Sequence, residues 1–310
     1  MRCSIINEFS CANVSRFLDL LTPWNVSAFP PGCIFRGHAD AEYKLLPSAL
    51  RLENEAKIYE MAPVKIGMSG KGRLEFEQAY LEYGLIREFY RLADARGLSV
   101  PISDFLRSQL FQSKDMLTLL NWTDNEKWLP DSLVEAAALA QHYGVPTRLL
   151  DWTYDPFVAA FFASYTQPSG AEKLCVWAMD VERTEFHSSL FGADSNLRVI
   201  HPPYAGNPNL AAQRGVFTHF AKPLRDARQT SYDVQNGAEI YVDRTTLDEY
   251  VDSRMSDDLK SGVRVFTKIT LPASMSAQLR ATLKRFGYSP SRMFPGYGGV
   301  AEEMLGKERQ

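Results

Sequence analysis

The chain has 310 residues, of which 45% are hydrophobic and 12% aromatic, so it can build a packed core and is not a disordered protein. The formal net charge of −3 excludes a broad basic surface, and any contact with nucleic acid would need a local basic patch. The four cysteines form no CxxC pair, which predicts reduced thiols and no metal site. No run of 18 apolar residues occurs, which predicts a soluble, cytoplasmic protein without membrane contact.

The first half of the chain is predicted to be rich in helix. Two prolines and a glycine at 30–32 form a turn signal before a short strand at 33–37, and another short element is expected at 45–51. Apolar side chains recur at helical spacing over about 73–95, and the segment 104–128 is also predicted to be helical.

The middle of the chain is predicted to form a helix, a strand and a second helix. The first helix is expected to begin at Ser132, in a capping box with Glu135, and to end at Gly144. A strand is expected at 147–152. An aspartate–proline pair then opens a helix over 157–165, which is nearly all apolar and therefore predicted to be buried.

The second half of the chain is predicted to be rich in strands. The expected strands are 174–179, 197–200, 216–220 and 263–271, with a further candidate at 239–242. Apolar residues at helical spacing from Met275 to Phe286, followed by Gly287, predict a late helix. We therefore predict a single α+β domain over 1–310, with a helical insertion at about 52–130.

The segment 140–153, AQHYGVPTRLLDWT, is the best candidate for a functional site. Connectors that only turn the chain are usually built from Gly, Ser, Asn and Pro. This one carries glutamine, histidine, tyrosine, arginine, aspartate and tryptophan, between a predicted helix and a predicted strand. Ligand-binding groups of α/β proteins commonly lie in such places.

Several motifs together resemble the FRG-domain family. The matching segments are FRG at 35–37, LPSALR at 46–51, QHYGVPTRLLDWT at 141–153, FFA at 161–163, QRGVFT at 213–218 and MFPGYGGVA at 293–301. They extend over most of the chain, and the central block is specific. The resemblance implies a single FRG domain.

A second resemblance, to ADP-ribosyltransferases, implies a chemistry. In those enzymes an arginine closes a first strand, a second strand ends in Ser or Thr before an apolar helix, and a third strand carries Glu or Gln. Arg36, Thr153 and Gln213 stand in that order here. The resemblance implies an ADP-ribosyltransferase-like split β-sheet core, with NAD as substrate and no metal.

The third position departs from the transferase pattern, because no Glu-x-Glu or Gln-x-Glu occurs at Gln213. This departure favours RNA over protein as the acceptor. The resemblance then implies an intracellular toxin of a toxin–antitoxin or anti-phage defence system, with an antitoxin-type protein partner that covers the cleft.

Under this resemblance, five residues have expected roles in binding and transfer. Arg36 would grip phosphate or ribose oxygens with its planar guanidinium, with pairing to a carboxylate such as Asp151 as the alternative. Gly37 would let the ligand approach the backbone. Gln213 would orient the ribose 2′-hydroxyl or an acceptor amine. Either Asp151 or Glu239 would be the acid that stabilises the ribosyl cation.

Four further residues are candidates for contact with the substrate. Tyr143 would stack on the nicotinamide or adenine ring, and His142 would hold a ribose hydroxyl or cap its helix. Thr153 would bond the nicotinamide ribose or cap the next helix. Phe161 is a candidate contact with the substrate, with packing in the core as the alternative.

Arg148 and Asp151 lie three positions apart on a predicted strand, so their side chains should point to opposite faces. We expect Arg148 to face the ligand and Asp151 to support a neighbouring arginine.

Two other functions fit the same residues. A metal-independent ribonuclease would use His142 and His219 as acid and base, with Arg36 or Arg148 on the phosphate. A non-catalytic nucleotide-sensing module would bind a nucleotide without turnover. For an RNA ligand, a candidate basic run comprises Arg214, Lys222, Arg225 and Arg228, with a solvated loop as the alternative.

Overall fold

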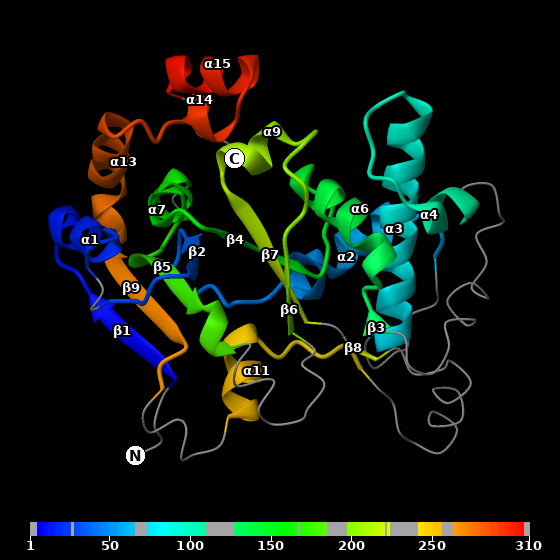
Figure 1. The fold of residues 1–310 in the computed structure, drawn as a ribbon, viewed down its shortest axis with the longest axis horizontal. Coiled ribbons are helices and arrows are strands. Elements are labelled where there is room, and N and C mark those ends of the chain that lie inside the picture. Colours follow the sequence, from blue (N-terminus) through cyan, green and yellow to red (C-terminus); the bar gives the residue numbers. More distant parts are fainter. Residues whose placement is uncertain are drawn as a thin grey trace.

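A seven-stranded mixed sheet forms the centre of the protein (Figure 1). The computed structural model describes residues 5–25, 28–65, 73–109, 127–166, 168–184, 197–220, 222–223, 241–255 and 263–306. In spatial order the strands are β1 (Ile6–Ser10), β9 (Phe266–Pro272), β5 (Lys173–Asp180), β2 (Cys33–His38), β4 (Leu149–Thr153), β7 (Gly215–Phe220) and β6 (Leu197–Ile200). Only β1 and β9 pair in parallel within this sheet. A second sheet consists of β3 (Lys127–Trp128) and β8 (Lys222–Pro223).

The sheet is weakly joined between β2 and β4. These strands share one registered pair, Phe35 with Thr153, whereas β2 pairs with β5 along its whole length and β4 does the same with β7. The backbone ladder therefore divides into two blocks that meet at a single point. The α+β class predicted from the sequence is confirmed.

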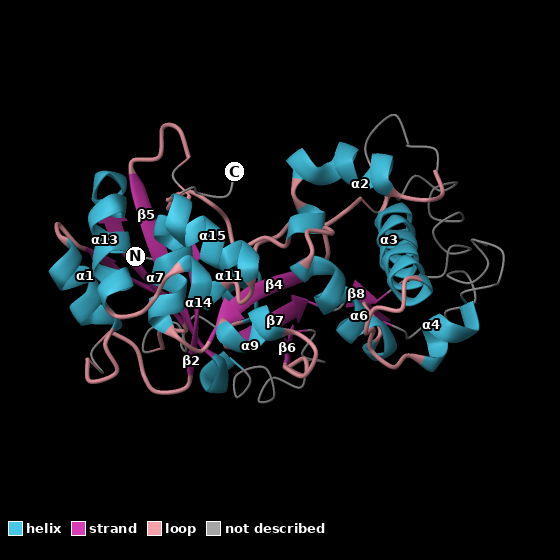
Figure 2. Ribbon diagram, turned by 90° about the horizontal axis from the view of Figure 1, so that it is seen from above, coloured by secondary structure: helices cyan, strands magenta, loops and turns pink. Residues whose placement is uncertain are grey.

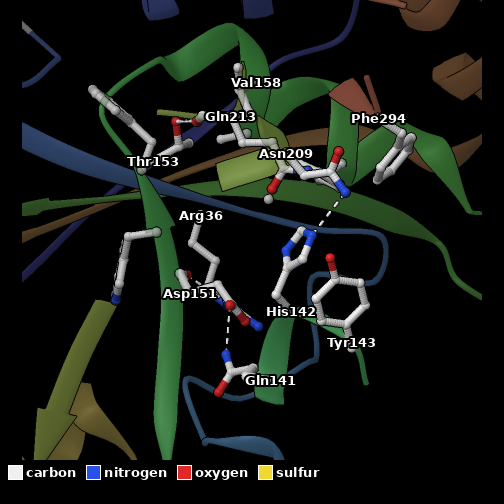
Figure 3. A pocket seen from close by; sticks show the side chains of 15 residues that line it. Arg36, Gln141, His142, Tyr143, Asp151, Thr153, Val158, Asn209, Gln213 and Phe294 are labelled. Atoms are coloured by element: carbon white, nitrogen blue, oxygen red, sulfur yellow. Dashed lines mark hydrogen bonds and ion pairs between the residues drawn. The ribbon is translucent and has the colours of Figure 1, made fainter. Parts of the chain in front are cut away.

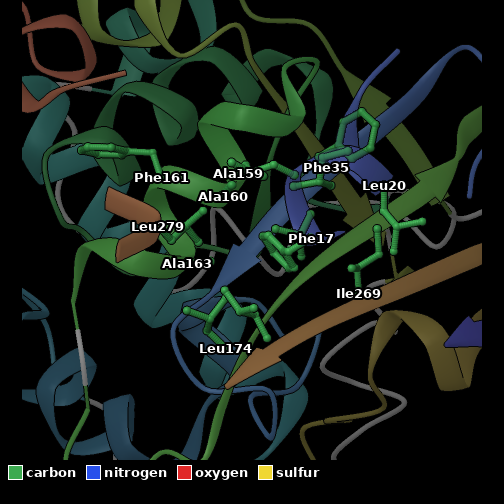
Figure 4. Close-up of a cluster of buried hydrophobic side chains, with 14 of the residues drawn as sticks. Phe17, Leu20, Phe35, Ala159, Ala160, Phe161, Ala163, Leu174, Ile269 and Leu279 are labelled. Atoms are coloured by element: carbon green, nitrogen blue, oxygen red, sulfur yellow. The ribbon is translucent and has the colours of Figure 1, made fainter. Parts of the chain in front are cut away.

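Three helices cover one face of the sheet: α7 (Pro156–Tyr165), α1 (Val14–Leu21) and α13 (Ser276–Arg285). Figure 4 shows the core between them, which includes Phe17, Leu20, Phe35, Ala160, Leu174, Ile269 and Leu279. The predicted start of α7 is confirmed, because Asp155 caps it by accepting a hydrogen bond from the Phe157 amide at 2.9 Å. A Cβ added to Gly37 would lie 1.9 Å from the Ala159 carbonyl oxygen, so α7 packs directly on the β2 backbone.

The opposite face of the sheet carries a separate apolar cluster. It contains Ile34, Leu150, Trp152, Trp177, Val216 and Phe266, and it extends to Leu247 and Val251 of α11 (Leu247–Arg254). Because successive side chains of a strand point to opposite faces, β2 contributes Phe35 to the first cluster and Ile34 to this one.

The predicted helical insertion packs beside the sheet (Figures 1 and 2). It contains α2 (Glu55–Met61), α3 (Glu75–Ala95) and α4 (Asp104–Gln109), and α6 (Asp131–His142) packs against α3 and α4. A further core joins these helices to the sheet through Tyr83, Tyr90, Trp128, Leu133, Leu149 and Phe217. Most of the predicted helix at 104–128 lies outside the described residues.

The predicted capping box of α6 is wrong. The helix begins at Asp131 after Pro130, and no side chain caps it. Proline already has the φ angle that a helix entry requires, and Asp131 places a negative charge in the first turn. The helix therefore starts one residue before Ser132.

The remaining elements are short and mostly peripheral. They are η1 (Ser48–Leu50), η2 (Leu52–Asn54), α9 (Pro208–Ala212), η3 (Ala273–Met275), α14 (Pro290–Met293) and α15 (Tyr297–Leu305). In the described part of the candidate strand 239–242, Tyr241 forms only an isolated bridge with Leu74. Gly287, with φ of +83°, follows the end of α13 as predicted. Among the described helices, none has the length and apolar character needed to span a bilayer.

Candidate functional site

A cavity of about 530 Å³ opens where β2 and β4 diverge, between the C-terminal end of α6 and the helices α7 and α9 (Figure 3). Its volume falls within the range of about 300–1,000 Å³ that is usual for small-molecule sites. The polar lining residues are Arg36, Gln141, His142, Tyr143, Asp151, Thr153, Asn209 and Gln213. The others are Phe35, Gly37, Trp152, Val158, Ala159, Phe162 and Phe294.

Arg36 crosses the gap between the two blocks of the sheet. Its Nε donates to Nε2 of His38 at 2.8 Å, and its Nη1 donates to the main-chain oxygen of Asp151 at 2.7 Å. Burial lowers the pKa of Arg36 and the Asp151 charge opposes that shift, so the guanidinium stays charged. Its Nη2 bonds to no residue that the structure describes, which leaves one edge of the guanidinium for a ligand.

Asp151 is held beside Arg36 by a residue that the sequence analysis did not select. Gln141 donates from Nε2 to Oδ1 of Asp151 at 2.6 Å, and its own Oε1 accepts from the Thr147 hydroxyl. The other carboxylate oxygen lies 3.5 Å from Arg36 Nη1, and the side chain is 58% exposed. The arrangement agrees with the expectation that Asp151 supports an arginine, and Asp151 also faces the cavity.

His142 and Tyr143 lie at the end of α6, as predicted, and both line the cavity. The Nε2 atom of His142 lies 2.8 Å from the amide nitrogen of Asn209, which comes from α9. The Tyr143 ring stacks on Phe89, with centroids 6.3 Å apart, and remains 66% exposed. This helix end therefore presents an accessible aromatic face beside a polar pair.

Thr153 and Gln213 meet on the other side of the cavity. The Thr153 hydroxyl donates to the main-chain oxygen of Gln213 at 2.6 Å and accepts from the Asp155 amide at 3.0 Å. The Gln213 side chain donates from Nε2 to the main-chain oxygen of Met293 at 3.0 Å. These bonds fix the end of β4, the start of β7 and the C-terminal segment that supplies Phe294 to the cavity wall.

Two of the predicted contacts serve packing. Phe161 is buried in the core and stacks on Tyr165 at 4.9 Å, so its assignment to the substrate site is wrong. It lies on the core face of α7, whereas Val158 and Phe162 share the face that lines the cavity. Gly37 borders the cavity, but the absence of its side chain is required by the contact with α7 and is not explained by a ligand.

Arg148 does not face the cavity, contrary to prediction. Its side chain is 3% exposed, and its guanidinium contacts Glu82 of α3, with Nε 2.9 Å from both carboxylate oxygens. It also forms an ion pair with Glu75. Burial alone would lower the pKa of Arg148, but these two carboxylates raise it above its ordinary value. The residue points toward the insertion, opposite to Asp151, and joins α3 to the sheet.

The structure does not bring His219 into the cavity with His142. His219 is buried on β7, where its Nε2 accepts from the Leu129 amide at 3.3 Å and its Nδ1 lies 2.8 Å from Arg198. Burial and the nearby positive charges lower its pKa well below the ordinary value. A neutral, fully engaged imidazole is poorly suited to be the acid or base of the predicted pair.

Other predicted residues cannot be placed in the site. Arg214 is exposed and has a φ of +48°, but it does not line the cavity. Glu239, Arg225, Arg228 and the side chain of Lys222 lie outside the described residues.

Some residues of the cavity wall were not predicted from the sequence, and only part of them lie in a sequence motif. Gln141 stands in the motif at 141–153 and could have been selected from it, and Phe294 stands in the motif at 293–301. Asn209 has no such signal, because only the placement of α9 brings it beside His142.

Comparison with known proteins gives one match, to a domain family. Neither the curated proteins nor the solved structures contain a match to the chain. The family model of the FRG domain matches residues 32–171, a range that includes β2, β4, α6 and α7 and thus most of the cavity wall. Asn209, Gln213 and Phe294 complete the wall from outside that range. The chain therefore contains an FRG domain, at residues 32–171.

Proposed function

We propose that this protein is an NAD-dependent ADP-ribosyltransferase and that NAD binds in the cavity between β2 and β4. The observation that carries the proposal is the convergence of Arg36, Thr153 and Gln213 on one cavity of about 530 Å³. They come from distant parts of the chain, and β2, β4 and β7 are consecutive neighbours in the sheet. The proposal extends to an ADP-ribosyltransferase-like core, and the near-separation of β2 from β4 supports a split sheet.

The lining of the cavity has the chemistry that a dinucleotide requires. The free edge of the Arg36 guanidinium would bind the diphosphate, where its fixed donors suit paired oxygens. The exposed ring of Tyr143 would stack on one base, and the apolar wall around Phe294 would receive the other ring. Asn209 and His142 would bond the ribose hydroxyls.

In the proposed reaction, the bond between the ribose C1′ and the nicotinamide nitrogen breaks, and neutral nicotinamide leaves with the electron pair. The Asp151 carboxylate would stabilise the resulting ribosyl cation, because it lines the cavity beside Arg36 and bears the opposite charge. A nucleophile on the acceptor forms the new bond to C1′ and releases its proton to Asp151 or to water.

Gln213 would position the reacting ribose without supplying charge. Its Nε2 is bonded to Met293, so its Oε1 is the atom available to a ribose hydroxyl. A neutral amide cannot offset a cation as a carboxylate does, which gives Asp151 the larger electrostatic role.

We further propose that the acceptor is single-stranded RNA and that the protein acts as a cytoplasmic toxin, restrained by an antitoxin-type partner over the cavity. The neutral Gln213 at the third motif position and the exposed Arg214 beside it support this choice. Expression of the wild-type gene alone should arrest cell growth, and the Arg36→Ala variant should not. Equal growth of the two strains would contradict the toxin proposal.

The transferase proposal is tested by nicotinamide release from NAD by the purified protein. The Arg36→Lys variant keeps the charge but loses the planar fork, and its rate should fall by about 100-fold or more. The matched control is Arg16→Lys, because Arg16 is exposed on α1 and paired only with Asp19 among the described residues. Its rate should equal that of the wild type.

The same samples distinguish the alternative functions. RNA cleavage without NAD would indicate a ribonuclease, and binding of ADP without release of nicotinamide from NAD would indicate a sensing module. Either result would contradict the transferase proposal. Modified RNA that carries ADP-ribose, with unmodified protein, would support the proposed acceptor.

A further inference from the structure

His38 contacts Arg36 directly and belongs to no motif considered above. It lies two positions after Arg36 on β2, on the same face of the strand. Its Nε2 accepts the hydrogen bond from Arg36 Nε at 2.8 Å, and the residue is only 4% exposed. An imidazole that accepts a hydrogen bond from a guanidinium must have a bare ring nitrogen at the point of contact.

We propose that His38 is the positioning residue of Arg36, an uncharged acceptor that orients the guanidinium and leaves its positive charge available to an anionic ligand. The nature of that ligand, a nucleotide diphosphate, rests on the proposed function, whereas the role of His38 toward Arg36 does not.

The surroundings of His38 keep its ring neutral. Burial lowers the pKa of His38 to about 2, and the positive charges of Arg36 and Arg51 act in the same direction. The neutral ring can therefore accept from Arg36 at pH 7. A carboxylate in its place would accept the same bond but would cancel the charge of the guanidinium.

The other acceptors on Arg36 follow the same pattern. The main-chain oxygen of Asp151, at 2.7 Å, is uncharged. The Asp151 carboxylate is more distant, at 3.5 Å, accepts a shorter bond from Gln141 and is largely exposed to water. Both close contacts of Arg36 are thus with neutral groups, so the ion pair across the cavity mouth is weak.

The test uses the free protein, labelled with ¹⁵N. A nitrogen–nitrogen scalar coupling across the hydrogen bond should join Arg36 Nε to Nε2 of His38, and the Arg36 Nε–H should exchange slowly with water. In the His38→Phe variant, which keeps an aromatic ring without the acceptor, this exchange should be about tenfold faster or more. His38→Gln supplies an amide oxygen as acceptor and should restore slow exchange.

Binding of ADP is the second measurement. His38→Phe should weaken the affinity by about tenfold, while His38→Gln should stay close to the wild type. The matched control is His201→Phe, because His201 is exposed, contacts Tyr154 and does not line the cavity. This variant should leave both the exchange rate and the affinity unchanged.

The inference would be overturned by absence of the coupling in the wild-type protein, or by unchanged Nε–H exchange in His38→Phe. The coupling needs no variant, so it decides the matter even if His38→Phe does not fold. If the wild type neither binds ADP nor releases nicotinamide, the proposed function fails, while the measurements on the free protein still decide the role of His38.

Discussion

The substitution Arg148→Met tests whether Arg148 is structural. Met has a similar length but no charge, and it would remove the ion-pair partner that Glu82 and Glu75 share. Both bond to the guanidinium of Arg148, whose side chain is 3% exposed, and Glu82 is itself 1% exposed. Removal of one partner from a buried ion pair usually costs about 3–5 kcal/mol, because the remaining charge stays desolvated. We expect a loss of that size in the free energy of unfolding.

The two hydrogen bonds that remain on Glu82 indicate how the loss can be reversed. Trp128 Nε1 and Gln78 Nε2 donate to it at 2.6 and 2.7 Å, and a glutamine carbonyl oxygen can accept one of them. The double variant Arg148→Met/Glu82→Gln removes the more deeply buried of the two unpaired charges and should regain about half of the lost stability or more.

Urea denaturation at pH 7 measures these changes as shifts in the midpoint. The control is Arg16→Met, which breaks an exposed ion pair with Asp19 and should change stability by less than about 1 kcal/mol. The reasoning is refuted if Arg148→Met stays within about 1 kcal/mol of the wild type. It is refuted as well if the folded variant loses ADP binding, because Arg148 would then act at the cavity.

Three further predictions concern packing and pH. Gly37→Ala should destabilise the protein by about 3 kcal/mol or more, since its Cβ would meet the α7 backbone at 1.9 Å; a thermal midpoint close to that of the wild type would contradict the contact. Phe161→Ala should lower the free energy of unfolding by about 3–5 kcal/mol, whereas Phe162→Ala should lower the affinity for ADP with a smaller loss of stability. Scanning calorimetry measures the stability of both variants, and titration calorimetry measures their affinity for ADP. A larger loss of ADP affinity in Phe161→Ala than in Phe162→Ala would contradict the placement of Phe161 in the core and of Phe162 in the cavity wall. The folded-state pKa of His38, about 2, and that of His219 lie below the unfolded value. The unfolded chain therefore binds more protons than the folded protein below about pH 6.5. The free energy of unfolding should keep its full value above that pH and should fall below it by about 1.4 kcal/mol per pH unit for each histidine. Urea midpoints between pH 7 and pH 5 should accordingly vary less with pH in His38→Gln/His219→Gln, and an unchanged slope would contradict this account.

Local patterns in the sequence were sufficient for most of the elements around the cavity. The pair Asp155–Pro156 predicts the start of α7, because a side-chain cap and a preset φ angle act within one helical turn. The strand at 33–37 is likewise found within β2. The elements that the sequence analysis missed, such as β1 and α1, lie at the start of the chain, where the short strand β1 is half-exposed and α1 spans only eight residues.

Part of the cavity wall was predicted from the residue types of the segment 140–153, together with Arg36 and Gln213. Alternation along a strand correctly separated Arg148 from Asp151, but it could not tell which of them would face the cavity. That choice depends on α3, whose two glutamates lie 66 and 73 residues away in the sequence and bind Arg148.

The sequence by itself determined where helices and strands begin and which chemical groups they carry, because those preferences arise from neighbouring residues. Only the tertiary structure decided which groups share a cavity. Gln141 reaches Asp151, Asn209 reaches His142 and Met293 binds Gln213 through contacts between separate elements. Such contacts result from the packing of a whole core, and no local pattern of residues encodes them.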